Sequence, residues 1–331
     1  MVVCSSSDNT GNAAFAKAAH TIGAGRRDGR TKARCALTIT PGSRPAIDWA
    51  ARIVGPDARV TAVRALRGGT HARTTLIQTV NPEFQAVLRE FPPGDDAAIR
   101  EAGVLRVLDG LGGLAPRLLA SGIDGVAADE SWILISRLPG TADITPDEPP
   151  ACAEQLGRVL ARIHATPRHR LAGFPSAGDR ASASLAAISG PAASVVGERR
   201  EMLARAPDVL THYDYWSGNV VWEAGVLTGA VDWCGAAPGP PGLDVGWCRL
   251  DLYLLHGERI ADQFLDAYQA ASQSALPDPL LWDLWAVARS HQMVETWMPN
   301  YRDLGRADLT AAELRKRHSA WTDRSLSHAA R

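Results

Sequence analysis

The segment from His212 to Asp232 contains the residue types that a phosphoryl-transfer site requires. Asp214 is followed five positions later by Asn219, and Asp232 comes after a stretch that reads as a short hairpin. Phosphoryl transfer needs one carboxylate to receive or orient the proton of the attacking hydroxyl. It also needs hard oxygen ligands, such as an amide and a second carboxylate, to hold Mg²⁺ on nucleotide phosphates. The order and spacing of these residues predict this chemistry.

An isolated Asp and Asn pair would more often form a turn or a helix cap, because both residue types favour such positions. In this chain the two acids and the amide occur with a histidine in a fixed order, and strand-like residues flank them on both sides. Matching segments upstream and downstream, described below, favour the functional interpretation.

The loop from His212 to Asn219 and the strand end Val231-Asp232-Trp233 resemble the aminoglycoside phosphotransferase and choline kinase-like superfamily. Its members carry an H-x-D-x-x-x-x-N loop and an I-D-W-type strand end. The resemblance implies that Asp214 positions the acceptor hydroxyl and that His212 braces the loop. It also implies that Asn219 and Asp232 bind Mg²⁺, with ATP as the phosphoryl donor. By eye the likeness runs from about residue 60 to about residue 290.

Three further segments extend the resemblance. GPPGLDVGWCR looks like the family segment in which an aspartate, here Asp244, steadies the catalytic loop through hydrogen bonds. LARIHA looks like the helix that precedes that loop, and we expect its His164 to be a core histidine with a hydrogen-bond partner. SRLPG resembles the linker between lobes against which adenine lies, which implies that Ser136 and Arg137 lie at the nucleotide.

The amino-terminal part carries the residues expected on the phosphate side of the nucleotide. Arg89 falls where protein kinases have a lysine on the third strand, and Glu101 falls where its ion-pair partner would be. Arginine stays charged and can grip phosphate oxygens with two nitrogens, so it can replace lysine. The paired glycines Gly68 and Gly69, with Thr70, form a short turn that would lie over the nucleotide as in the family.

The elements that must position these residues follow from hydrophobic periodicity. Strand patterns cover residues 60–66, 74–80, 85–91 and 131–137, and helical patterns cover 97–108 and 156–165. Residues 209–235 alternate like short strands around a loop, and the chain after Pro241 reads as helices.

This order of elements predicts an α+β protein with a small antiparallel-sheet lobe and a larger helical lobe, and the resemblance implies that the fold is bilobal and protein kinase-like. We expect residues 1–45 to be a disordered tail, because they are rich in small and basic residues and have no periodic apolar face. Residues 46–140 would form the nucleotide-covering lobe, and residues 141–331 the lobe with the catalytic loop and acceptor site.

Composition excludes several classes of protein. The formal net charge is -1, so no overall field favours nucleic acid or an anionic membrane as a partner. The five cysteines form no CxxC pair, and neither a signal peptide nor a membrane span is visible. We therefore expect a cytoplasmic protein whose partner is a small hydroxyl compound; the sequence leaves its oligomeric state open.

The acceptor is also open: aminoglycosides, macrolides, choline-like alcohols, sugars and homoserine-like amino acids are all consistent with the resemblance. Trp282 and Trp285 share a helix face and could line the acceptor pocket, among the acids Asp283, Glu295 and Asp303. The main alternative is a pseudokinase that binds nucleotide in a regulatory role, which the arginine at position 89 supports. A nucleic-acid partner that uses the basic tail is the third interpretation.

Overall fold

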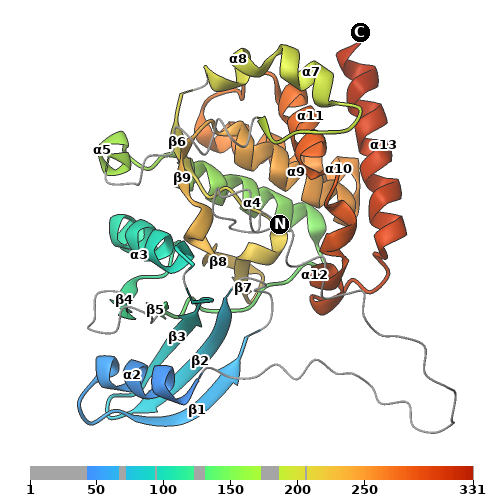
Figure 1. The fold of residues 1–331 in the computed structure, drawn as a ribbon. Coiled ribbons are helices and arrows are strands. Elements are labelled where there is room, and N and C mark those ends of the chain that lie inside the picture. The colour runs from blue at the N-terminus through green and yellow to red at the C-terminus, as the bar shows by residue number, and fades with distance from the viewer. Residues whose placement is uncertain are drawn as a thin grey trace, which may run out of the picture.

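The computed structural model describes residues 43–66, 72–93, 95–122, 131–172, 186–205 and 207–330. A small sheet lobe lies at the bottom of Figure 1 and a larger helical lobe lies above it. The bilobal α+β architecture predicted from the sequence is confirmed.

The small lobe is a five-stranded antiparallel sheet with strand order β1-β2-β3-β5-β4. Its three leading strands and its fifth match the predicted segments within a few residues. Its elements are α2 (Arg44–Val54), β1 (Arg59–Ala65), β2 (Arg73–Val80), β3 (Phe84–Glu90), α3 (Ala97–Leu108), η1 (Asp109–Gly113), β4 (Leu118–Ser121) and β5 (Trp132–Ser136).

The two faces of this sheet are covered by different helices, as the alternation of side chains along a strand requires. Leu88 of β3 packs in the cluster that contains Ala46 and Ala50 of α2. Val87, its neighbour, belongs to the larger core that contains the buried face of α3. Helix α2 and the four-residue strand β4 were not predicted. Strand β4 is too short for a periodic signal, whereas α2 has apolar residues at helical spacing, Ile47, Ala50 and Val54, that were not assigned to an element.

The linker between the lobes is attached to the helical lobe directly after β5. Thr141 and Trp222 exchange two backbone hydrogen bonds, at 3.1 and 2.9 Å. Gly140 has a φ of 92°, and a Cβ there would lie 2.1 Å from the Trp222 carbonyl oxygen. Only glycine fits this close approach, so the predicted linker crosses to the second lobe at a sterically fixed point.

The helical lobe contains two small β-ladders, β6–β9 and β7–β8, among its helices. Its elements are α4 (Pro149–His164), α5 (Arg168–Leu171), α7 (Ala193–Glu198), α8 (Arg200–Ala204), β6 (Val209–Thr211), η3 (Ser217–Asn219), β7 (Val220–Glu223), β8 (Val226–Ala230), η4 (Trp233–Gly235), β9 (Ala237–Gly239), α9 (Gly242–His256), α10 (Glu258–Ser272), α11 (Pro279–Ser290), η5 (Val294–Trp297), α12 (Met298–Asp303) and α13 (Ala311–Ala329).

Two glycines set the spacing of the central helices. A Cβ at Gly157 of α4 would lie 2.5 Å from the Phe264 carbonyl oxygen of α10. A Cβ at Gly246 of α9 would lie 2.5 Å from the Trp282 carbonyl oxygen of α11. Helix α9 is buried along nearly its whole length, and it therefore forms the axis of this lobe.

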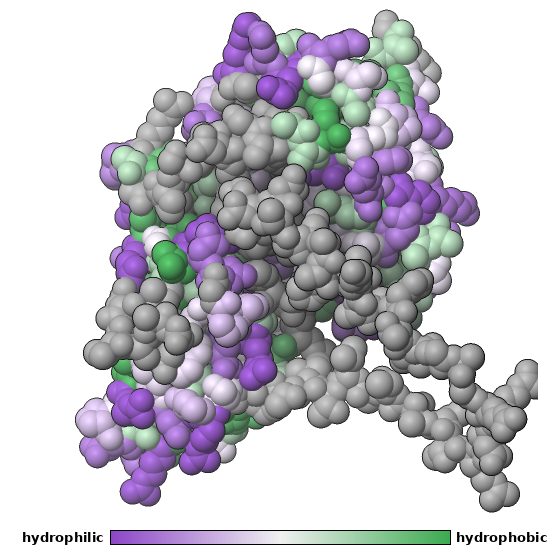
Figure 2. All heavy atoms as spheres, viewed as in Figure 1, coloured by the Kyte–Doolittle hydropathy of each residue, from purple (hydrophilic) through white to green (hydrophobic). Residues whose placement is uncertain are grey.

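The described surface carries hydrophilic side chains at the outer ends of both lobes (Figure 2). Among the described residues, no helix is long and apolar enough to span a membrane.

Candidate active site

The candidate catalytic loop leaves β6 at Thr211 and returns through η3 to β7. Asp214, near its centre, is 8% exposed. Its Oδ1 accepts a hydrogen bond from Trp247 Nε1 at 3.1 Å, and its Oδ2 accepts one from Asn219 Nδ2 at 3.0 Å. Each carboxylate oxygen is thus oriented by a neutral donor. These two donors fix the orientation of the carboxylate.

One face of α9 supplies the main supports of this loop. Asp244, Trp247 and Asp251 lie at positions i, i+3 and i+7 of the helix, which is the spacing of one face. In the same order they bind the backbone at His212 and Tyr213, the carboxylate of Asp214 and the backbone at Ser217. The helix therefore holds the loop at successive points along its length.

Asp244 binds the start of the loop. Its two oxygens accept hydrogen bonds from the backbone nitrogens of His212 and Tyr213, both at 2.7 Å. Oδ2 also lies 3.1 Å from His164 Nε2, whose other nitrogen lies 2.9 Å from the Tyr268 hydroxyl. The predictions that Asp244 steadies the loop and that His164 is a partnered core histidine are confirmed.

His212 lies fully buried beneath the loop. Its Nε2 is 2.9 Å from the carbonyl oxygen of Val231, the residue before Asp232, and its ring packs 4.5 Å from that of Trp233. The histidine thus connects the catalytic loop to the strand end that bears the second acid. That His212 acts as a brace of the loop stays a prediction.

Asp251 holds the end of the loop. Its Oδ2 accepts hydrogen bonds from the backbone nitrogen and the hydroxyl of Ser217, at 3.0 and 2.5 Å, and its Oδ1 accepts one from the Tyr301 hydroxyl at 2.7 Å. Burial raises the pKa of Asp251, although these donors oppose that rise. Sequence reasoning missed Trp247 and Asp251. Their spacing from Asp244 is the signal that could have identified them.

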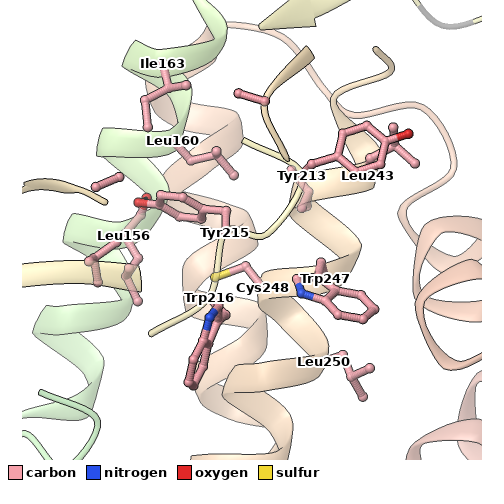
Figure 3. Packing of buried hydrophobic residues seen from close by; sticks show 14 of the residues in the cluster. Leu156, Leu160, Ile163, Tyr213, Tyr215, Trp216, Leu243, Trp247, Cys248 and Leu250 are labelled. Atoms are coloured by element: carbon pink, nitrogen blue, oxygen red, sulfur yellow. Dashed lines mark hydrogen bonds between the residues drawn. The ribbon is translucent and has the colours of Figure 1, made fainter. Parts of the chain in front are cut away.

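Aromatic side chains fill the space around the loop (Figure 3). Tyr215 points toward α4, where its hydroxyl donates to the Leu156 carbonyl oxygen at 3.0 Å. Trp216 packs edge to face against Tyr301, with ring centroids 5.8 Å apart. The loop is therefore packed on α4 as well as on α9, which limits its movement.

The β7–β8 hairpin brings Asn219 and Asp232 together at its open end, opposite the turn. Asn219 immediately precedes β7 and Asp232 follows shortly after β8, and Val220 pairs with Ala230. The Val231 nitrogen also donates to the Asn219 carbonyl oxygen at 2.9 Å. Asp232 has a φ of 67°, in the left-handed region, and its side chain is 26% exposed.

Arg89 of β3 connects Asp232 to Glu101 of α3. Its Nη1 lies 2.5 Å from Glu101 Oε1, and its Nη2 donates to Asp232 Oδ1 at 2.8 Å. The guanidinium lies over the Phe91 ring, 5.3 Å from its centroid. The structure thus brings together two of the predicted nucleotide residues and one of the predicted metal ligands in one buried cluster of three charges, the Arg89 cluster.

The two acids of the Arg89 cluster respond differently to their surroundings. Burial raises the pKa of Glu101 to about 7, even though Arg89 opposes the rise. Burial also acts to raise the pKa of Asp232, but there the charge and the hydrogen bond of Arg89, together with His212 and Cys234, outweigh burial and the net shift is downward. Two carboxylates that share one cation cannot both ionise freely, so their pKa values separate.

The residues present fit a magnesium nucleotide. The Asn219 amide donates through its nitrogen to Asp214, which leaves its carbonyl oxygen as a hard ligand, and Asp232 adds a partly exposed carboxylate. No group of three or more His, Cys, Asp or Glu side chains able to hold a metal occurs in the described segments. Mg²⁺ commonly completes its shell with water and substrate phosphates, which suits a pair of this kind.

The remaining residues predicted to bind the nucleotide, Ser136 and Arg137, have no contact with the Arg89 cluster among the hydrogen bonds of the described residues. Ser136 Oγ accepts a hydrogen bond from the Arg117 nitrogen at 2.9 Å, and Arg137 binds the Gln85 side chain. Both lie at the sheet end of the linker. The predicted glycine turn, Gly68, Gly69 and Thr70, lies outside the described residues.

The side chains suggested for the acceptor pocket are largely engaged elsewhere. Asp283 forms two hydrogen bonds with Arg249, at 2.8 and 3.0 Å. Glu295 likewise binds Arg315, at 2.5 and 2.6 Å. Asp303 lies on the surface beside Arg302. Trp282 packs on Gly242 and Gly246 of α9, whereas Trp285 lies near Trp247, with ring centroids 6.3 Å apart.

The sequence matches a known family of enzymes. The model of the phosphotransferase enzyme family matches residues 62–285. No curated protein sequence matches the chain.

Similar solved structures share the fold. A Ralstonia eutropha protein proposed to be an aminoglycoside phosphotransferase is 15% identical, with a TM-score of 0.59 over 86% of this chain and 96% of that one. A thermostable mutant of the aminoglycoside phosphotransferase APH(4)-Ia, in complex with ADP and hygromycin B, is 17% identical, with a TM-score of 0.57 over 85% and 98%. Macrolide 2'-phosphotransferase type I is 17% identical, with a TM-score of 0.54 over 84% and 98%.

Proposed function

The chain belongs to the phosphotransferase enzyme family, and from this premise we propose that it transfers the γ-phosphoryl group of ATP to a hydroxyl group of a small molecule. The observation that carries the proposal is the carboxylate of Asp214, held by Trp247 and Asn219 beside the end of the hairpin that also bears Asp232. ATP, rather than another donor, is proposed from the family resemblance of the loop and from the ADP-bound similar structure.

In the proposed reaction, Asp214 accepts a hydrogen bond from the acceptor hydroxyl and orients its oxygen toward the γ-phosphorus. The hydroxyl oxygen forms a bond to phosphorus while the bond from phosphorus to the bridging oxygen of ADP breaks. The hydroxyl proton passes to Asp214, and ADP leaves. Trp247 and Asn219 prevent the carboxylate from rotating away, since each holds one of its oxygens.

The nucleotide phosphates would lie between the Arg89 cluster and the loop. Asn219 and Asp232 would hold Mg²⁺, which supplies charge neutralisation on the phosphate oxygens when it is bound. Arg89 keeps Asp232 ionised, and Glu101 holds Arg89 in place. A planar guanidinium can bind a carboxylate and a phosphate oxygen at the same time, so Arg89 could contact both.

The test is a screen of purified protein with ATP and Mg²⁺ against hydroxyl-bearing metabolites and antibiotics, with mass detection of a phosphorylated product. Asp214→Asn should lower phosphoryl transfer by roughly 10²–10⁴-fold, the usual range for loss of a positioned general base. The melting temperature and ATP affinity should change little, because asparagine is nearly isosteric with aspartate.

Asp57→Asn, at an exposed position in the sheet lobe, is the matched control and should keep full activity. If the wild type binds MgATP but phosphorylates no compound of the panel, and Asp214→Asn behaves identically, the enzyme proposal fails. The pseudokinase interpretation would then replace it.

A further inference from the structure

Arg289, in the last turn of α11, lies beside the catalytic loop. It follows Trp285 by four residues, which places it one turn along the same face of the helix. The Trp285 ring lies 6.3 Å from that of Trp247, and Trp247 Nε1 donates to Asp214 at 3.1 Å. Helix α11 therefore brings a cation, as well as an aromatic ring, to the side of the loop where Asp214 is held.

The acidic side chain that acts on the charge of Arg289 is that of Asp214. The side chain is half-buried, and none of the hydrogen bonds or ion pairs within the described part of the chain involves it. Burial lowers the pKa of Arg289, while neighbouring Tyr213 and Asp214 act against that change. A partly buried cation without a hydrogen-bonded anion loses hydration without full compensation. Arg289 can therefore gain from an anion on a bound molecule.

The acids nearby show the opposite behaviour. Asp283 and Glu295 are each held by an arginine through two hydrogen bonds. Asp251 accepts hydrogen bonds from Ser217 and Tyr301. Among the described residues on this side of the loop, these three acids are thus occupied, whereas Arg289 forms no hydrogen bond or ion pair, although the charge of Asp214 acts on it. A polycationic acceptor would find little compensation here and would meet the charge of Arg289.

We propose that Arg289 binds an oxyanion, a carboxylate or a phosphate, on the acceptor whose hydroxyl group Asp214 activates. The acceptor class is therefore hydroxy acids or hydroxyl-bearing phosphate esters. The guanidinium provides two parallel donors that match either anion, and a charge-assisted pair of this kind orients as well as binds. The inference rests on the proposed phosphotransferase function and assigns its acceptor.

The experiment compares pairs of hydroxyl-bearing probes, one with an anionic group and one without. Wild-type protein with ATP and Mg²⁺ is assayed with 4-hydroxybutanoate against 4-hydroxybutanamide, and with glycerol 3-phosphate against glycerol. We expect at least one anion to exceed its neutral partner in kcat/KM by roughly 10–100-fold, mainly through KM. Arg289→Gln should abolish that preference, and Arg289→Lys should keep part of it. Which pair shows the preference identifies the anion.

Arg259→Gln is the matched control, since it removes one positive charge from an exposed position on α10. Equal use of charged and neutral probes, or a preference that survives Arg289→Gln, would overturn the inference and leave the phosphotransferase function intact. Phosphorylation of polycationic aminoglycosides, but of neither anionic probe, would also overturn the inference and leave the phosphotransferase function intact.

A binding measurement separates the two proposals if no probe is phosphorylated. The four probes are titrated by calorimetry into wild type and Arg289→Gln with ADP and Mg²⁺ present. Binding of an anion that depends on Arg289 would support the inference although the proposed function had failed. No binding of either anion would overturn the inference.

Discussion

The catalytic loop and the Arg89 cluster are held in different ways, although they face the same proposed reaction. The loop takes its main supports from one face of α9, and the donors to its buried carboxylates are chiefly backbone nitrogens and neutral side chains. The Arg89 cluster joins charges from β3, α3 and the segment after β8. Folding of the helical lobe fixes the loop geometry, whereas the Arg89 cluster also requires the lobes to dock and its groups to be correctly ionised.

The largest effect is expected from Asp244→Ala, which removes the first support of the loop. Two backbone nitrogens and His164 would lose their acceptor in a fully buried place. At about 1–3 kcal/mol for each buried unpaired donor, the free energy of unfolding should fall by about 4 kcal/mol. Unfolding in denaturant measures this change in the free energy of unfolding.

Asp266→Ala, at an exposed position on α10, is the control and should change the free energy of unfolding by less than about 0.5 kcal/mol. Asp244→Asn should lie between the two, because it retains one acceptor oxygen. Similar losses in Asp244→Ala and the control would show that α9 does not hold the loop.

Arg89→Ala should have the next largest effect and should act on the other region. Removal of the cation leaves Glu101 buried beside Asp232, and the unfolding free energy should fall by about 3 kcal/mol at pH 8. The double variant Arg89→Ala/Glu101→Gln should recover part of this loss. Nucleotide affinity should fall with Arg89→Ala and much less with Arg89→Lys. If Arg89→Ala were as stable as wild type at pH 8, the inference that charge pairing with Arg89 stabilises this cluster would be wrong.

The pH dependence of stability should distinguish the two regions. The pKa of Glu101 is about 7 in the folded protein, above its ordinary value near 4.5, so the folded state binds this proton more tightly than the unfolded state. Its contribution is present below about pH 4.5 and is lost as the pH rises through 7. We expect wild type to lose roughly 2 kcal/mol relative to Glu101→Gln between pH 5 and pH 8. Parallel stability curves for the two proteins would refute this assignment.

The smallest effect is expected from Trp247→Phe. The change removes the Nε1 donor to Asp214 while an aromatic ring can still pack against Trp297, whose centroid is 5.2 Å away. We expect kcat to fall about tenfold, which corresponds to about 1.4 kcal/mol, with ATP affinity unchanged. Trp321→Phe, on α13, should leave kcat unaltered. An unchanged kcat in Trp247→Phe would mean that Asn219 alone orients the carboxylate.

The sequence predicted the sheet lobe and the order of the site residues well, because these depend on local pattern. Strands of seven or eight residues rich in apolar side chains and a loop of eight residues leave a clear signal. Strand β4 was missed because four residues are too few for a periodic signal, whereas α2 was missed although its apolar residues recur at helical spacing. Trp247, Asp251 and Arg289 were missed as site residues for another reason. Their roles arise only when α9 and α11 pack beside the loop, which is a long-range effect.

The close contact between Gly246 and Trp282 has a consequence for how such a protein could change over time. Because α11 touches α9 through backbone there, any larger residue at position 246 would move both helices and, with them, the support of Asp214. The half-buried side chain of Arg289, farther along α11, lies outside this contact. Substitution of that side chain can therefore change the acceptor while the contact with Gly246 keeps the support of Asp214 in place.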